Sequence, residues 1–67
     1  MLVIIVDIDF NCFSLKDEEG NLDEQLSLIR KAIEKSEFDK GNIENVIVIV
    51  EDKNPCFVSR ATWRSLL

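Results

Sequence analysis

A chain of 67 residues has room for one domain, and a domain of this size buries only about 60% of the surface that its unfolded chain exposes. The net charge of −5 argues against extended contact with nucleic acid phosphates or anionic membranes, and six apolar residues at the start are too few for a membrane span or a signal-peptide core. Because the start lacks a signal peptide and two cysteines could form at most one bridge, we expect a reducing cytoplasm with free thiols. The absence of histidine and of paired-cysteine spacing argues against a zinc site, which leaves self-association as the expected source of added stability.

Two apolar segments organise the chain. Residues 2–6 and 46–50 are continuous runs of aliphatic, mostly β-branched side chains, which predicts strands with apolar contacts on both faces. Between them, Phe13 and Leu15 alternate with polar neighbours, which is typical of a short, half-exposed strand. We expect that strand to pair with the first one.

Residues 22–38 predict an amphipathic helix. Asn21 and Glu24 have the spacing of a capping box at its start, and Gly41 is expected to close it in the left-handed conformation. Phe38 lies off the apolar side and is expected to tuck under the following loop. The apolar stripe and its flank recur at helical spacing, and consist of Leu22, Leu26, Ile29 and Ile33 with Leu28 and Ala32 beside them.

The predicted fold is α/β. A strand, a crossover helix and a second strand form a βαβ unit, in which the two strands run parallel. After Pro55, residues 56–58 predict a short strand, and Ser59 can cap a final helical turn. We therefore expect residues 1–67 to form a single small domain with a three- or four-stranded mixed sheet, one main helix at 22–38 on one face, and a short C-terminal helical turn.

Parallel strands would bring several carboxylates to one edge of the sheet. Asp7 and Asp9 end the first strand, and Glu51 and Asp52 end the later one. Such a cluster could bind Mg²⁺ or Mn²⁺ and support phosphodiester cleavage. Acidic residues also end many strands simply because water solvates them there, and we favour that interpretation over a metal site.

A partial resemblance bears on the metal hypothesis. A strand ending in Asp7, an acidic Gly-Asn turn at 17–21, a helix and a strand ending in Glu51 are similar to the opening of the RNase H-like fold of RuvC-type resolvases and actin-like ATPases. The tail at 57–64 is similar to a later strand and Trp-bearing helix of RuvC-like nucleases. The resemblance implies that Asp7 and Glu51 are metal ligands. A third hairpin strand, a helix after the Glu strand and a closing acidic helix have no counterpart, which implies a miniature or a remnant.

The cysteines and the C-terminal cluster each have two interpretations. Cys12 and Cys56 each precede a phenylalanine, and we expect small core residues rather than reactive thiols. Trp63 is either a core residue that covers the sheet, with Arg60 and Arg64 balancing the acidic surplus, or the centre of a binding anchor, because Trp and Arg are enriched at binding hot spots. The sequence leaves both interpretations open.

The leading functional hypothesis is a small acidic protein-binding module without enzymatic activity or a cofactor. In size and charge the chain resembles the inhibitors and regulators that phages and mobile elements encode. It would form a homodimer and present carboxylates to a basic nucleic-acid-binding surface of a protein partner, with no nucleic acid or membrane bound directly. A small-molecule site between subunits is a third possibility. The predicted binding residues are Asp17, Glu18, Glu19, Asp23, Glu24, Arg60, Trp63 and Arg64.

Overall fold

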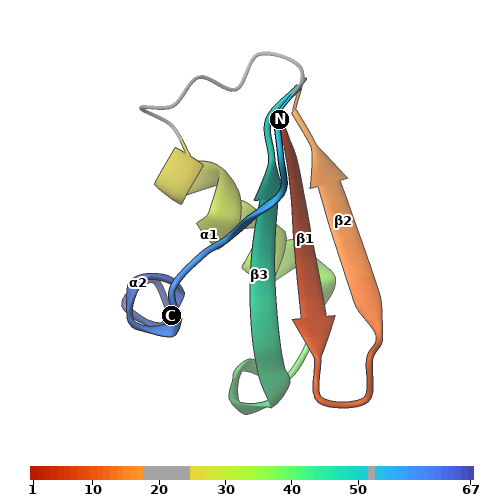
Figure 1. Ribbon diagram of the computed structural model, residues 1–67. Coiled ribbons are helices and arrows are strands. Elements are labelled where there is room, and N and C mark those ends of the chain that lie inside the picture. Colours follow the sequence, from red (N-terminus) through yellow and green to blue (C-terminus); the bar gives the residue numbers. More distant parts are fainter. Residues whose placement is uncertain (18–24, 52) are drawn as a thin grey trace.

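The computed structural model describes residues 1–17, 25–51 and 53–67 and has an α/β fold with helices on one side of a small sheet (Figure 1). In chain order the elements are β1 (Leu2–Asp7), β2 (Cys12–Lys16), α1 (Gln25–Ser36), the 3-10 turn η2 (Lys40–Asn42), β3 (Ile43–Ile49), β4 (Cys56–Phe57) and α2 (Arg60–Arg64). The α/β class, the four strands, the main helix and the short C-terminal helix confirm the prediction. No helix in the described ranges is long and apolar enough to cross a membrane.

The sheet is antiparallel throughout, with the strand order β2-β1-β3-β4. The predicted mixed sheet, with β1 and β3 parallel, is therefore wrong. The β1–β2 hairpin reverses the chain before it enters α1, so the crossover helix connects β2 to β3 rather than β1 to β3. Those two strands run in the same direction, but β1 lies between them and pairs antiparallel with both.

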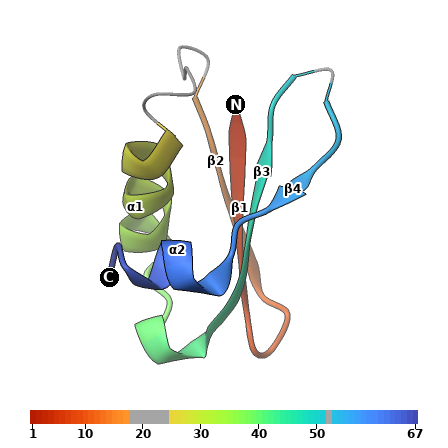
Figure 2. The same cartoon turned by 60° about the vertical axis from the view of Figure 1, so that its left-hand side comes forward.

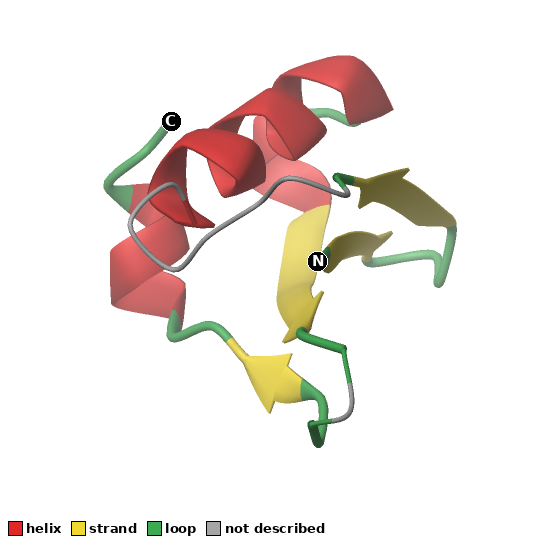
Figure 3. Cartoon of the chain, turned by 90° about the horizontal axis from the view of Figure 1, so that it is seen from above, coloured by secondary structure: helices red, strands yellow, loops and turns green. Residues whose placement is uncertain are grey.

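The hydrophobic core lies between one face of the sheet and the two helices. Figure 2 shows α1 and α2 together on that face, and Figure 3 shows the same separation from above. Because side chains alternate along a strand, every second residue of β1 and β3 points toward the helices. The buried core residues are Val3, Ile5, Leu28, Ile29, Ala32, Ile33, Ile43, Val46, Val48 and Trp63.

The buried side of α1 is rotated from the predicted stripe. Leu28 and Ala32, which we placed on its flank, are buried with Ile29 and Ile33, whereas Leu26 is 51% exposed. The rest of the predicted start of the helix, including Leu22 and the capping box, lies outside the described residues.

The end of α1 does not use Gly41. The residue with a left-handed backbone is Glu37, with φ of 59°, directly after the helix, while Gly41 lies in η2 and has no positive φ. The Ser36 hydroxyl donates to the Ile33 carbonyl at 2.7 Å and accepts from the Phe38 amide at 3.3 Å. As predicted, Phe38 is half-buried against the core under this loop.

The C-terminal helix is capped as predicted. The Ser59 hydroxyl accepts a hydrogen bond from the Thr62 amide at 3.2 Å, which satisfies one of the free amides in the first turn of α2. The preceding Val58 amide donates to the Val46 carbonyl at 2.8 Å and so holds the segment against β3. As a result, Trp63 enters the core between the sheet and α1.

Candidate protein-binding surface

The face of the sheet that points away from the helices is apolar. Side chains on this face come from alternate positions of β1 and β3 and from Phe57 of β4. Apart from Phe57, which is 69% exposed, they are half-exposed. We call this surface the open face, and its residues are Leu2, Ile4, Val6, Ile47, Ile49 and Phe57.

The strand register makes the open face continuous. Leu2 lies opposite Ile49, Ile4 lies opposite Ile47, and Ile47 in turn lies opposite Phe57 on β4. Side chains opposite each other in antiparallel strands are about 4.5–5.5 Å apart at Cβ, so these residues touch across three strands. An antiparallel sheet with one face in water ordinarily carries polar side chains there. Here the solvent side of β1 is aliphatic, and that of β3 is aliphatic at Ile47 and Ile49, with the polar Asn45 at its N-terminal end opposite Val6.

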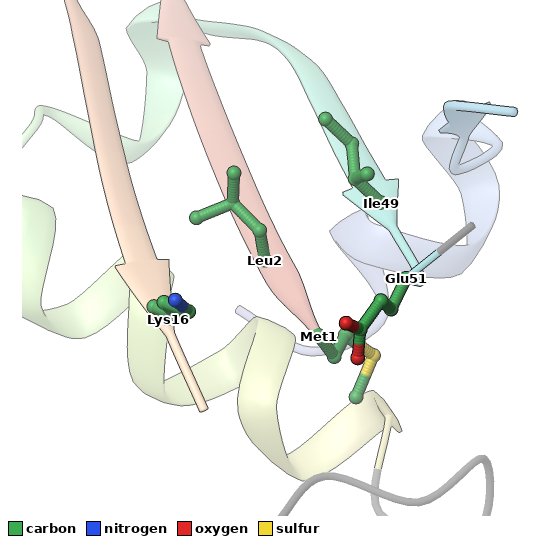
Figure 4. Close-up of a pocket in the computed structure, with 5 residues that line it drawn as sticks. All are labelled: Met1, Leu2, Lys16, Ile49 and Glu51. Atoms are coloured by element: carbon green, nitrogen blue, oxygen red, sulfur yellow. The ribbon is translucent and has the colours of Figure 1, made fainter. Parts of the chain in front are cut away.

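Polar and charged groups border this apolar surface. On β2, Lys16, Ser14 and Cys12 lie opposite Leu2, Ile4 and Val6. At the N-terminal end of β1 an open hollow of about 530 Å³ is lined by Met1, Leu2, Lys16, Ile49 and Glu51. Figure 4 shows Lys16 on one side of Leu2 and Glu51 on the other side, beyond the end of β3. The border therefore carries one positive and one negative charge at the same end of the sheet.

Asp7 has a structural role in the β1–β2 turn. Its carboxylate accepts hydrogen bonds from the amide of Asp9 at 2.9 Å, from the amide of Asn11 at 2.8 Å and from the side-chain amide of Asn11 at 3.0 Å. These donors, the Asn11 side chain first, lower the pKa of Asp7 below its ordinary value of 3.8, against a smaller opposing effect of desolvation. The turn also holds Phe10 with φ of 62° and 86% exposed.

The expected meeting of Asp7, Asp9 and Glu51 does not occur. Asp7 lies opposite Ile43 at the start of β3, whereas Glu51 follows the end of that strand, where Ile49 lies opposite Leu2. The two ends are separated by about 17 Å, which is five residues of strand. The metal-site prediction depended on parallel strands, and the antiparallel pairing sends Asp7 and Glu51 to opposite ends. Within residues 1–17, 25–51 and 53–67, no three acidic or cysteine side chains form a group that could hold a metal ion.

Most of the predicted acidic surface lies outside the described residues. This applies to Glu18, Glu19, Asp23 and Glu24, and also to Asp52. Asp17 is described, and its backbone closes the end of the hairpin. The Met1 ammonium donates to the Asp17 carbonyl at 2.8 Å, and the Asp17 amide donates to the Met1 carbonyl at 2.9 Å.

The C-terminal cluster divides between the core and the surface. Trp63 is 1% exposed and is the largest fully buried side chain, so it is a core residue in this fold. Arg60 forms an exposed ion pair with Glu44, with 3.2 Å between Nη2 and Oε2. The Arg64 guanidinium lies 5.8 Å from the centroid of the Trp63 ring. Arg60 therefore pairs with an acidic residue, as expected if the arginines balance the acidic surplus of the chain.

Both cysteines lie on the surface as free thiols, so the expectation of buried cysteines is wrong. Cys12 begins β2, an edge strand, and its side chain is on the same side as Val6. Cys56 begins β4, the opposite edge strand, and lies opposite Val48. Edge positions leave these small side chains without a neighbour on their outer side, which explains their exposure.

The open face was missed when candidate site residues were chosen from the sequence, although a signal for it was present. Residues 2–6 and 46–50 were expected to be buried on both faces because they do not alternate. The structure buries one face of each strand and leaves the other half-exposed. No family model, curated protein or solved structure matches this chain.

Proposed function

We propose that this protein is a small protein-binding module and that the open face is its main contact surface. The observation that supports this is the mismatch between the two central strands and their surroundings. Their sequences suit strands buried on both faces, yet α1 and α2 cover only one face. A second protein layer on the open face would complete the burial.

The energetics favour such a layer. Covering apolar surface contributes about 25 cal/mol for each Å² removed from water, and contiguous apolar surface on a small protein is a recognised mark of an interaction site. The open face combines an apolar centre in β1 and β3 with polar and charged groups at its edges, including Lys16 and Glu51. A dry centre with a polar border is the usual anatomy of protein interfaces.

We further propose that the module is an inhibitor or regulator that works in the cytoplasm. Support comes from the net charge of −5 in 67 residues, which would let carboxylates compete for a basic nucleic-acid-binding surface on a partner protein. The acidic residues at 17–24 are the candidates for this contact. Reversing Glu18, Glu19, Asp23 and Glu24 to Lys should abolish partner binding with an unchanged circular dichroism melt, and unchanged affinity would contradict this acidic contact.

The open-face proposal is tested by native mass spectrometry of the tagged protein recovered gently from cells that express it. The test variant is Ile47→Lys, which places a charge in the centre of the open face at a half-exposed position. The matched control is Leu26→Lys, because Leu26 is an exposed aliphatic residue on α1, away from the open face. Circular dichroism first establishes that both variants are folded.

We expect the wild type and Leu26→Lys to retain a second protein mass, whether another copy or a different protein, and Ile47→Lys to lose it. Retention of the same mass by Ile47→Lys would contradict the assignment of the open face. A wild-type chain recovered with no bound protein would contradict the proposed function itself.

A further inference from the structure

We propose that the partner on the open face is a second copy of this chain, packed sheet to sheet about a twofold axis. This inference rests on the proposed function, since it names the partner of the same surface. The axis would run along the strands and pass between β1 and β3, midway between the two sheets. Facing sheets in proteins commonly pack in this aligned way, with the two sheets about 10 Å apart.

The apolar rows of the open face are self-complementary under this twofold axis. Rotation places β1 of one copy over β3 of the other at the same height along the strands. The register pairs Leu2 with Ile49 and Ile4 with Ile47 within one copy, so the same pairs face each other between copies. Leu2 and Ile4 of one sheet therefore meet Ile49 and Ile47 of the second, in the self-complementary way that a closed twofold interface requires, and Val6 meets Asn45 at the far end of the open face.

The charges at the border supply the argument for a second copy over a different protein. Lys16 lies on the β2 side of Leu2, and Glu51 lies on the β3 side, beyond Ile49, at the same end of the open face. The twofold axis exchanges these two sides, so Lys16 of each copy approaches Glu51 of the other. A second copy thus provides both complementary charges and forms two ion pairs by symmetry.

The size of the open face sets the expected affinity. The four strands contribute 6, 5, 7 and 2 residues, and at about 3.4 Å per residue and about 4.8 Å between strands they give roughly 300 Å² of flat sheet per copy. A standard interface buries about 800 Å² per partner, so this contact is at the small end of specific interfaces. We therefore expect a dimer that exchanges with the monomer at micromolar concentrations.

Sedimentation equilibrium from about 1 µM to about 1 mM tests the proposal with charge variants. Lys16→Glu changes the net charge from −5 to −7, and Glu51→Lys changes it from −5 to −3. If only overall repulsion controlled association, these two variants would shift the Kd in opposite directions. If the two residues pair across the axis, both variants weaken the dimer, by about tenfold, because each turns two attractions into repulsions.

The double variant, Lys16→Glu with Glu51→Lys, restores the pairs with reversed sign and keeps the net charge at −5. We expect its Kd to return to within about threefold of the wild-type value. We also expect Ile47→Lys to remain monomeric and Leu26→Lys to dimerise normally. Failure of the double variant to recover would overturn this packing.

The outcomes also separate this inference from the proposed function. A wild-type chain that is monomeric over the whole range, but captures a different protein in an Ile47-dependent way, overturns the second-copy inference and leaves the binding module standing. A dimer that Ile47→Lys does not weaken overturns both the packing and the assignment of the open face.

Discussion

Replacement of Trp63 by alanine distinguishes its structural role from a binding role. Trp63 is 1% exposed and fills the space between the sheet, α1 and α2. Truncation of a buried Trp to Ala removes about 3–5 kcal/mol, because the lost contacts leave a cavity. A domain of 67 residues has a total free energy of unfolding of about 3–10 kcal/mol. The substitution should therefore remove at least about a third of the free energy of unfolding, and all of it if the wild type lies at the low end of this range.

The assay is urea unfolding followed by far-ultraviolet circular dichroism, since the variant lacks the only tryptophan. Trp63→Phe should retain the fold with a smaller loss of stability. Arg64→Ala is the matched control, because Arg64 is exposed and its cation–π contact with Trp63 is worth about 0.5–1 kcal/mol. A Trp63→Ala variant within about 1 kcal/mol of the wild type would refute the core assignment and restore the binding-anchor interpretation.

Three further results are expected. Hydrogen bonds lower the pKa of Asp7, so they contribute stability that is present above its ordinary pKa of 3.8 and is lost as the pH falls through its lower folded value. Asp7→Asn has no group to titrate at this position and should show a smaller acid-induced drop in melting temperature than the wild type. An equal drop would contradict this role of Asp7. Phe10→Gly should raise the free energy of unfolding by about 0.5–1 kcal/mol in urea titrations, because Phe10 is exposed with φ of 62°, and a decrease would show that its ring packs. A double-mutant cycle on Arg60 and Glu44 should give a coupling of about 0.2–1 kcal/mol that shrinks with added salt, and a salt-independent coupling would argue against an exposed ion pair.

The local elements follow from short-range chemistry, so the sequence predicts them well. Continuous β-branched runs indicate β1 and β3, and Ser59 with a free hydroxyl indicates the start of α2. The position of Phe38 under the loop also follows, because it falls off the apolar side of α1. In each case the decisive interaction lies within a few residues of the one that carries the pattern.

The direction of β3 relative to β1 could not be predicted from local patterns of this kind. It depends on how many strands precede the crossover helix, and β2 adds one reversal that changes the direction of β3 relative to β1. The positions of Asp7 and Glu51 depend entirely on that reversal. The alternative hypothesis of a metal site at Asp7 and Glu51 thus came from a correct set of strands with the wrong relative direction, and the two residues lie at opposite ends of the sheet.

The burial of individual side chains on α1 could not be predicted from the sequence, because it depends on which side of the helix packs against the sheet. Leu26 and Leu28 have the same chemistry but lie about 200° apart around a helix, so only one of them can face the sheet, and the sequence does not say which. Similarly, Glu37 rather than Gly41 takes the left-handed backbone, because the hydrogen bonds of Ser36 end the helix earlier. The continuous apolar run of β1 predicted a strand with apolar contacts on both faces. The helices cover only one of these faces, and the other is the open face.

The most direct test of the central claim is solvent accessibility of the isoleucine methyl groups at low and high protein concentration. A soluble paramagnetic probe measured by NMR would report on Ile4, Ile47 and Ile49, with the exposed Leu26 as an internal control. We predict that these three isoleucines become protected as concentration rises while Leu26 stays accessible. Equal accessibility of the three isoleucines at both concentrations would contradict the covering of the open face by a second copy.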